Sequence, residues 1–308
     1  MSKTRGTQRG WILALALFAI IGWAGPAAAA GYARPELLIS TEELAKLASQ
    51  PGIKIVDVRA ADAYKAGHIP GALSMPRPST QYTAGGVPAL IAPAEKIEEI
   101  FGKLGIKPTD TLVLYDESVS REVARVFWTA DVLGHAKIRV LNGGMSKWAK
   151  EKRTISKEVP PVTAAAYKAK PDKSKVADAK YVQASMKKPA TVLLDSRSAR
   201  EWTGAVASGG VKRAGKIPGS VNVDSDLVLA SSGGVKVFKS ADALAKLFAK
   251  AGVSKDKEIV IYCLTGVRAS HNYLALKLLG YNNLKNYDGS MIEWGNRPEL
   301  PMEKSAKN

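Results

Sequence analysis

The sequence is poor in the residues that bind metal ions and form disulfides. Its 308 residues include one cysteine, Cys263, and three separated histidines, His68, His135 and His271. A single cysteine excludes an intrachain disulfide and a cysteine-rich zinc site, and three scattered histidines do not make a histidine-based metal site. We therefore expect no metal site, and the setting of Cys263 becomes the informative feature.

Acidic residues are also few. The chain carries 28 Asp and Glu against 45 Lys and Arg, which gives a formal net charge of +17 at pH 7. The lysines lack the interleaved aromatics of a nucleic-acid-binding protein, so we expect a solvated basic surface that attracts small anions, and no nucleic-acid partner. The composition, 46% hydrophobic and 24% charged, excludes a mainly disordered, collagen-like or polytopic membrane protein.

The first thirty residues contain no acidic residue and have the layout of a secretory signal. A basic head with Lys3, Arg5 and Arg9 precedes the apolar run Trp11–Trp23, and small residues follow at Ala28–Ala30. The apolar run is shorter than the about 20 residues of a typical membrane span. This layout predicts a periplasmic or secreted protein that has no membrane partner after signal removal. The alternative is an uncleaved N-terminal anchor.

The rest of the chain is duplicated. Four landmarks recur in the same order in the two halves, which indicates duplication rather than chance. They are Asp57-Val58-Arg59 with Asp195-Ser196-Arg197, Gly67-His68-Ile69-Pro70-Gly71 with Gly215-Lys216-Ile217-Pro218-Gly219, Leu112–Tyr115 with Ile259–Tyr262, and Gly143 and Trp148 with Gly289 and Trp294. We predict a first domain over 31–155, a Pro- and Lys-rich linker over 156–175 and a second domain over 176–303.

Each half alternates short apolar runs with amphipathic stretches. This alternation predicts an α/β fold in which each domain has a mainly parallel sheet flanked by helices. The predicted helices are 41–49, 93–104, 121–133, 179–186, 241–250 and 269–279, and the predicted strands are 54–58, 111–115, 138–141, 191–194, 258–262 and 284–287.

Cys263 directly follows one of these predicted strands. The loop from Cys263 to Arg268 joins that strand to the next predicted helix, at the edge where parallel α/β sheets bind ligands. Turned backbone N–H groups, the positive end of the helix dipole and the Arg268 charge would favour the thiolate over the thiol. Gly266 permits a backbone angle that other residues resist. We therefore predict a nucleophilic Cys263; the alternative is a core cysteine at a strand end.

With these motifs the chain resembles the tandem-domain rhodanese family of sulfurtransferases over nearly all of 36–303. The resemblance rests on the Asp-x-Arg and Ile-Pro-Gly motifs of both halves, on the loop that begins at Cys263, and on Asp288-Gly289 with Trp294. It implies that the Cys263 thiolate takes a sulfur from thiosulfate or 3-mercaptopyruvate as a persulfide. Cyanide, a thiol or a sulfur-carrier protein then accepts that sulfur.

The resemblance also implies that the loop binds the substrate sulfur. Its backbone N–H groups would hold the anionic sulfur as an oxyanion hole holds oxygen. The residues that supply them are Leu264, Thr265, Gly266, Val267 and Arg268. No metal ion or organic cofactor is implied.

The first domain has no cysteine at the corresponding position. Its strand ending at Tyr115 places Asp116 opposite Cys263 and Arg121 opposite Arg268. An aspartate cannot carry a persulfide, so we predict an inactive first domain in which Asp116 pairs with Arg121. Four residues separate the cysteine from the arginine, one fewer than in related cysteine phosphatases, which disfavours phosphatase or arsenate reductase chemistry.

The sequence leaves the donor open between thiosulfate and 3-mercaptopyruvate. The family's substrate-binding arginine, six residues after the aspartate of its Asp-x-Arg motif, falls here on Glu201, with Arg200 beside it. A donor that carries a carboxylate is therefore not assured. Thr265 and Arg268 could both contact a sulfonate, which favours thiosulfate.

A second hypothesis is a sulfur-carrier or sulfur-binding module with little turnover of its own. The apolar side chains of Leu264 and Val267 would suit docking against a protein acceptor. Other candidate residues are given structural roles. We expect His271 to be a surface or hydrogen-bonded histidine, and both Asp-x-Arg motifs to form internal ion pairs.

Overall fold

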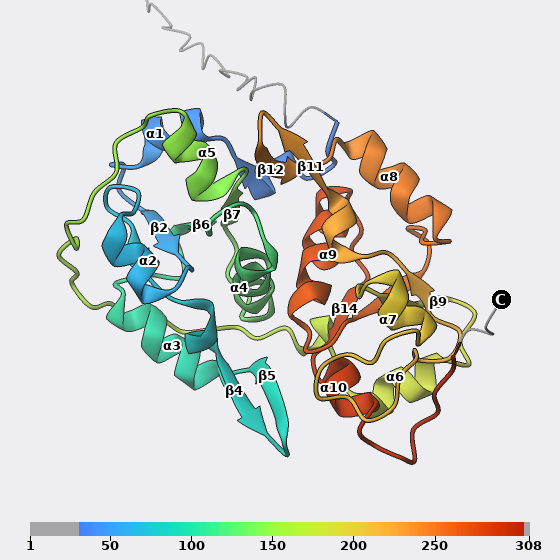
Figure 1. Cartoon of the computed structure of the whole chain (residues 1–308). Helices are drawn as coiled ribbons and strands as arrows, with labels where there is room; N and C mark the ends of the chain where they lie inside the picture. The colour runs from blue at the N-terminus through green and yellow to red at the C-terminus, as the bar shows by residue number, and fades with distance from the viewer. Residues whose placement is uncertain (1–30, 305–308) are drawn as a thin grey trace, which may run out of the picture.

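The computed structural model describes residues 31–304 of the chain. The secretory signal predicted for the first thirty residues lies outside the described residues. Figure 1 shows two halves side by side, each built around its own sheet. Within residues 31–304, no helix is both long and apolar enough to cross a membrane.

Each half has a five-stranded sheet at its centre. The first sheet contains β1 (Leu38–Ile39), β2 (Ile53–Asp57), β3 (Leu73–Ser74), β6 (Thr111–Tyr115) and β7 (Ile138–Leu141), and the second contains β8 (Val176–Ala177), β9 (Thr191–Asp195), β10 (Val221–Asn222), β13 (Glu258–Tyr262) and β14 (Leu284–Tyr287). Their orders, β1-β7-β6-β2-β3 and β8-β14-β13-β9-β10, correspond strand for strand, and all neighbours are parallel. The predicted fold class and duplication are thus confirmed.

Helices flank both sheets. Those of the first half are α1 (Thr41–Leu47), α2 (Ala61–Ala66), α3 (Ala94–Lys103), α4 (Arg121–Val132) and α5 (Gly144–Lys150), and those of the second are α6 (Ala179–Ser185), α7 (Ala199–Thr203), α8 (Ala241–Lys250), α9 (Val267–Leu278) and α10 (Ser290–Trp294). Several begin at a polar N-cap; the Ser40 hydroxyl, for example, accepts a hydrogen bond from the Glu43 N–H. The helix α9 begins two residues earlier than predicted, so that Arg268 lies in its first turn.

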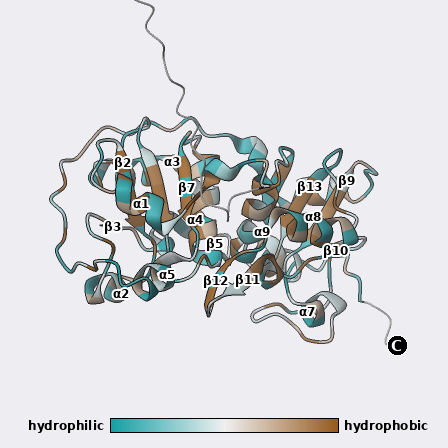
Figure 2. Cartoon of the chain, turned by 90° about the horizontal axis from the view of Figure 1, so that it is seen from above, coloured by the Kyte–Doolittle hydropathy of each residue, from teal (hydrophilic) through white to brown (hydrophobic). Residues whose placement is uncertain are grey.

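The strands are buried because helices cover the sheets. Ile259, Val260 and Ile261 of β13 are all fully buried, as expected for a β-branched run in a parallel sheet. Figure 2 shows the hydrophobic colour concentrated in strands such as β2, β7, β9 and β13. The second half therefore presents the end of β13 on a rigid support.

Two hairpins add to the predicted elements. They are β4 (Gln81–Ala84) with β5 (Val87–Ile91), and β11 (Leu229–Ser232) with β12 (Val235–Phe238). Each turns at a glycine pair with positive φ, Gly85-Gly86 and Gly233-Gly234. Such pairs are the sequence signal of a tight hairpin turn, and they would have identified both elements.

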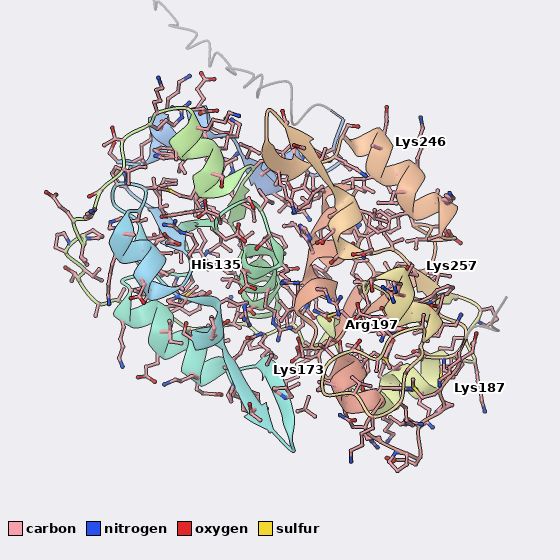
Figure 3. All side chains as sticks on the ribbon, in the orientation of Figure 1. His135, Lys173, Lys187, Arg197, Lys246 and Lys257 are labelled. Carbon is pink, nitrogen blue, oxygen red and sulfur yellow. The ribbon has the colours of Figure 1, made fainter. Side chains whose placement is uncertain are left out.

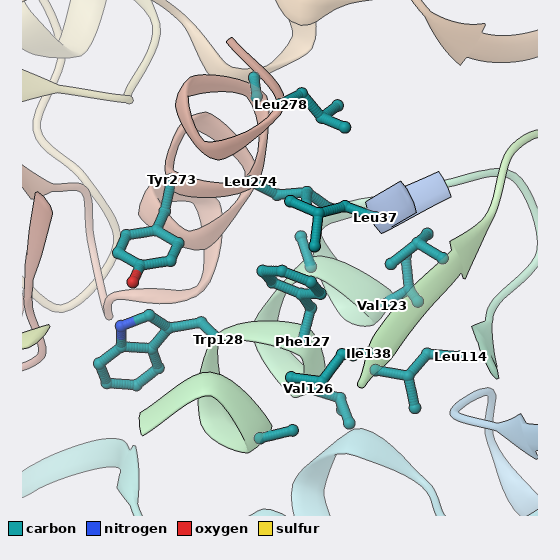
Figure 4. Close-up of a cluster of buried hydrophobic side chains, with 14 of the residues drawn as sticks. Leu37, Leu114, Val123, Val126, Phe127, Trp128, Ile138, Tyr273, Leu274 and Leu278 are labelled. Carbon is teal, nitrogen blue, oxygen red and sulfur yellow. The ribbon is translucent and has the colours of Figure 1, made fainter. Parts of the chain in front are cut away.

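The helices α4 and α9 form the contact between the two halves (Figure 1). Figure 4 shows Phe127 and Trp128 of α4 facing Tyr273, Leu274 and Leu278 of α9. These side chains belong to one hydrophobic cluster that spans both halves. The shared cluster fixes the first domain against the helix that follows the Cys263 loop.

Each half also reaches across to the other with its hairpin. The Ile91 N–H at the end of β5 donates to Asp288 Oδ2 at 2.7 Å, next to α10. The Phe238 N–H at the end of β12 donates to Asn142 Oδ1 at 3.1 Å, next to α5. Ile91 and Phe238 occupy corresponding positions in the two repeats, as do Asn142 and Asp288, so the domains hold each other through a pseudo-symmetric pair of contacts.

Both Asp-x-Arg motifs form the predicted internal ion pairs. Arg197 Nη2 lies 2.6 Å from Asp195 Oδ2 and donates to the Gly215 carbonyl at 2.8 Å. The Arg59–Asp57 pair has the same separation of 2.6 Å. Figure 3 places Arg197 within the second half, whereas the labelled Lys187, Lys246 and Lys257 lie on its outer side. The pairs tie each strand end to the glycine turn that follows.

His271 departs from the prediction. It is 1% exposed on α9, and neither ring nitrogen has a hydrogen-bond partner among the described residues. Its ring centroid lies 5.5 Å from that of Phe238 on the β11–β12 hairpin. The expectation of a surface histidine is wrong because packing of the hairpin onto α9 covers the ring. This burial lowers the pKa of His271 to about 4.

Because His271 is buried, we predict that the free energy of unfolding decreases when the pH is lowered below about 6.5, the ordinary pKa of histidine. The unfolded chain binds a proton near pH 6.5 that the folded chain does not take up until about pH 4. The free energy of unfolding therefore decreases as pH falls through this window, by about 1–2 kcal/mol between pH 7 and 5. In His271→Gln that part of the pH dependence should disappear. Denaturant unfolding at both pH values measures it, and equal slopes in the two proteins would contradict the assignment.

Candidate active site

The structure places Cys263 at the carboxyl end of β13, as predicted, but buries it. Cys263 is 1% exposed and belongs to the hydrophobic cluster, whereas Leu264, Thr265 and Arg268 are partly exposed. Gly266 adopts a φ of +73°, in the left-handed region that favours glycine. Cys263 is thus buried at the start of a turned loop, and the next two residues, Leu264 and Thr265, are partly exposed.

A hydroxyl from the start of α10 braces the loop. The N–H groups of Cys263 and Gly266 both donate to Ser290 Oγ, at 3.1 and 2.9 Å. Ser290 in turn donates to the Tyr287 carbonyl at 2.7 Å and has a φ of +48°, which is unusual for a residue other than glycine. The Gly266 N–H is therefore engaged, contrary to the expectation that it faces the substrate sulfur. Ser290 is a site residue that the sequence reasoning missed, although it directly follows the Asp288-Gly289 motif.

The other N–H groups of the loop are free of backbone partners. Within residues 31–304, no backbone carbonyl accepts a hydrogen bond from the N–H of Leu264, Thr265, Val267 or Arg268. The carbonyls of Cys263 and Leu264 are instead turned towards α10, where they accept from Met291 and Ile292 at 3.0 and 2.9 Å. The loop consequently has donors to offer to an anion.

The first domain holds a loop of the same design with an acidic side chain in it. Asp116, at the position of Cys263, accepts hydrogen bonds from the N–H groups of Ser118, Ser120 and Val123 at 2.9–3.1 Å and from the Ser120 hydroxyl at 2.5 Å. Val119 has a φ of +58°, like Gly266 at the corresponding position. Burial raises the pKa of Asp116, while these hydrogen bonds oppose the rise. Since every partner is a donor, the carboxylate form suits this loop.

The predicted pairing of Asp116 with Arg121 is wrong. Arg121 is exposed, and its Nε lies 3.9 Å from Glu122 Oε1. The turned loop already supplies enough N–H donors for Asp116, so an exposed guanidinium adds little to it.

Arg268 is not a free positive charge. Its Nη1 and Nη2 donate to the two carboxylate oxygens of Glu201 at 2.8 and 2.9 Å, in a bidentate pair. Burial alone would raise the pKa of Glu201, but hydrogen bonds from Arg268, Ser208 and Ser198 hold it well below its usual range. Glu201 therefore balances the charge that Arg268 was expected to bring to Cys263. Arg200 is exposed on α7.

Two hollows of the structure lie away from Cys263. One of about 680 Å³ is bordered by Lys54, Lys107 and the segment 160–166 of the predicted linker. Among the residues that the structure describes, no group of His, Cys, Asp and Glu side chains is placed to hold a metal ion.

Comparisons with known proteins identify the family of this chain. The family model of the rhodanese-like domain matches residues 40–151 and 178–297. The thiosulfate sulfurtransferase of Azotobacter vinelandii is 32% identical over 272 residues, which cover 88% of this chain and 98% of the relative. The sulfur carrier protein TtuD of Thermus thermophilus is 34% identical over 289 residues, which cover 90% of this chain and 100% of the relative.

A solved structure has the same fold. The anaerobic ergothioneine biosynthesis enzyme from Chlorobium limicola, in complex with trimethyl histidine, matches with a TM-score of 0.79 at 23% identity, over 90% of this chain and 72% of that one. The chain belongs to the rhodanese-like family, with two such domains in tandem. It is a sulfurtransferase.

Removing the Ser290 hydroxyl should loosen the loop. In Ser290→Ala the N–H groups of Cys263 and Gly266 lose their acceptor, at a cost of about 1–3 kcal/mol for an unsatisfied buried donor. We expect sulfur transfer and the alkylation rate of Cys263 to fall roughly tenfold or more. Ser185→Ala is the control, because that buried hydroxyl donates to the Tyr181 carbonyl within α6. Equal losses in both variants would argue against a bracing role.

Freeing Arg268 should change which reagents reach Cys263. In Glu201→Gln the guanidinium loses its charge partner. The ratio of the alkylation rate constant with anionic iodoacetate to that with neutral iodoacetamide should then rise roughly threefold or more at low salt. In Arg268→Ala the same ratio should fall, and alkylation below pH 7 should slow. The ratio of the two rate constants is the measurement, and high salt should reduce the effect. An unchanged ratio in both variants would show that the pair does not set the charge at the site.

Proposed function

We propose that this sulfurtransferase moves a sulfane sulfur from thiosulfate, or a related small anion, to cyanide or a thiol through a persulfide on Cys263. The observation that carries the proposal is the first domain's loop, in which a carboxylate accepts hydrogen bonds from the N–H groups of Ser118 and Ser120. The corresponding groups of the second loop belong to Thr265 and Val267, and they have no backbone partner within residues 31–304. An anionic sulfur on Cys263 would meet the same kind of donors.

The reaction balances without a cofactor. The Cys263 thiolate attacks the outer sulfur of thiosulfate, a sulfur–sulfur bond forms to the cysteine, and sulfite leaves with the electron pair of the bond that breaks. Cyanide then attacks the terminal sulfur of the persulfide, thiocyanate leaves, and the thiolate is restored. Neither step needs an external oxidant, reductant or net proton transfer.

The site residues divide this work between them. The N–H groups of Leu264, Thr265, Val267 and Arg268 stabilise the anionic sulfur, and Gly266 makes the turn that presents them. Since Cys263 is 1% exposed, the donor reaches it only after neighbouring side chains move. The partly exposed residues beside it define the side from which the donor enters.

Glu201 supports thiosulfate over 3-mercaptopyruvate as the donor. Its carboxylate occupies the position where the family resemblance implies a substrate-binding arginine, and it already pairs with Arg268. A donor carrying its own carboxylate would find no guanidinium at this position to pair with it, whereas a sulfonate can bind through N–H groups and the Thr265 hydroxyl.

A sulfur carrier with slow turnover is the second candidate. It is supported by the relative TtuD, which is named a sulfur carrier protein, and by the partly exposed Leu264 beside Cys263. Val267 was expected to share in docking but is 8% exposed, so it offers little surface. The acceptor would then be a protein thiol rather than cyanide.

The compartment that we propose is the periplasm or the cell exterior. The basic head, short apolar run and small residues of the first thirty residues support export. In such an oxidising compartment a lone cysteine has no intrachain partner with which it could form a disulfide.

Replacing the cysteine tests the mechanism. With thiosulfate and cyanide, we expect steady thiocyanate production by the wild type and none by Cys263→Ser. Intact-mass spectrometry after thiosulfate alone should show the mass of one added sulfur atom on the wild type only. A persulfide without turnover would favour the carrier, and turnover by Cys263→Ser would refute the proposed chemistry.

A further inference from the structure

A charged side chain of the first domain lies against the loop of the second. Arg125 on α4 is fully buried, and its guanidinium lies over the Trp128 ring at 4.4 Å. A Cβ added to Gly266 would lie 2.9 Å from Arg125 Nη1. The domain without a cysteine therefore places a guanidinium in direct contact with the turn that follows Cys263.

The guanidinium is anchored on one side only. Its Nη2 lies 2.7 Å from Asp288 Oδ1 and donates to the Ala89 carbonyl of β5 at 2.8 Å. Arg125 Nε and Nη1 have no hydrogen-bond partner among the described residues. Burying an arginine with unpartnered donors is costly, and a stable fold does not in general require it.

The partner of Arg125 begins the turn that braces the loop. Asp288 precedes Gly289 and Ser290, and its other oxygen accepts the Ile91 N–H at 2.7 Å. A Cβ added to Gly266 would also lie 3.0 Å from Asp288 Oδ1. The first domain thus holds Asp288 from two sides, and the hydroxyl two residues later holds the N–H groups of Cys263 and Gly266.

The duplicated fold contains an internal comparison. In the repeat, Asn272 corresponds to Arg125 and Asn142 corresponds to Asp288. Asn272 donates within its own domain, to Ser196 Oγ and the Val223 carbonyl, and Asn142 accepts the Phe238 N–H from the opposite hairpin. The hairpin contact is therefore made on both sides, whereas the charged pair occurs only on the side of the cysteine.

We propose that Arg125 is a positioning residue for Cys263, which acts across the domain interface by fixing Asp288 and the turn that carries Ser290. The proposal rests on the sulfur transfer proposed above, which assigns the chemistry to Cys263. Arg125 does not touch the reacting sulfur in this scheme. It keeps the loop in the arrangement in which its free N–H groups converge on the anion, and it gives the cysteine-free domain a part in the reaction.

The test separates positioning from stability. In Arg125→Met we expect kcat to fall at least tenfold, because the loop N–H groups no longer converge on the anionic sulfur. Alkylation of Cys263 by iodoacetamide should shift to higher pH. Arg139→Met is the matched control, because Arg139 pairs with Glu43 at 2.6 Å inside the first domain and also has an unpartnered Nε. It should lower the melting temperature and leave both kcat and the alkylation profile unchanged.

A double variant covers the case in which Arg125→Met does not fold. Arg125→Gln with Asp288→Asn replaces the charges by neutral amides, close to the pair found at the other loop, and should fold. We expect the same loss of kcat and the same shift of the alkylation profile.

Two results distinguish the proposals. A folded variant with wild-type kcat and alkylation profile would overturn the role of Arg125. A wild type that transfers no sulfur, combined with a shifted profile in the variants, would overturn the proposed function and leave the positioning role intact.

Discussion

The site depends on one hydroxyl that accepts two backbone N–H groups. Ser290 Oγ holds the N–H of Cys263 and of Gly266, and the first turn of α10 holds the neighbouring carbonyls. The carbonyls of Cys263 and Leu264 accept hydrogen bonds from α10, and the remaining N–H groups of the loop, which have no backbone partner within residues 31–304, could bind an anion. A loop of this length has many conformations in isolation. Because Ser290 and α10 hold it in one conformation in the folded protein, the entropy cost of ordering the loop is not added to the cost of binding a donor.

The duplication shows what such a loop does with a negative charge. In the first domain the position of the cysteine is filled by Asp116, and the N–H groups close on its carboxylate. In the second domain the same backbone surrounds a thiol, and four loop N–H groups have no backbone partner within the described part of the chain. One repeat therefore holds a carboxyl group within its loop, and the other holds a thiol there. This difference between two copies of one fold distinguishes the loop to which sulfur transfer is assigned above from the loop that has no thiol.

Charge near the cysteine is balanced rather than accumulated. Arg268 is matched by Glu201, and Arg125 is matched by Asp288. The net positive charge of the chain is thus carried elsewhere, on lysines such as those at the outer side of the second half (Figure 3). With these charges balanced, the anion binding proposed above would depend on the directed backbone donors of the loop.

The amino-acid sequence by itself determined the features that depend on local pattern. The repeated motifs, the alternation of strands and helices and the placement of Cys263 at a strand end follow from residue spacing, because burial periodicity and turn chemistry act over a few residues. The glycine pairs of the hairpins belong to the same class of signal. Only the tertiary structure decided the burial of His271 and Cys263, the pairing of Arg268 with Glu201 and the contact of Arg125 with Asp288. These contacts join residues that are distant in the chain, and the packing of α4 on α9 and of each hairpin on the opposite domain selects them, which no local pattern encodes.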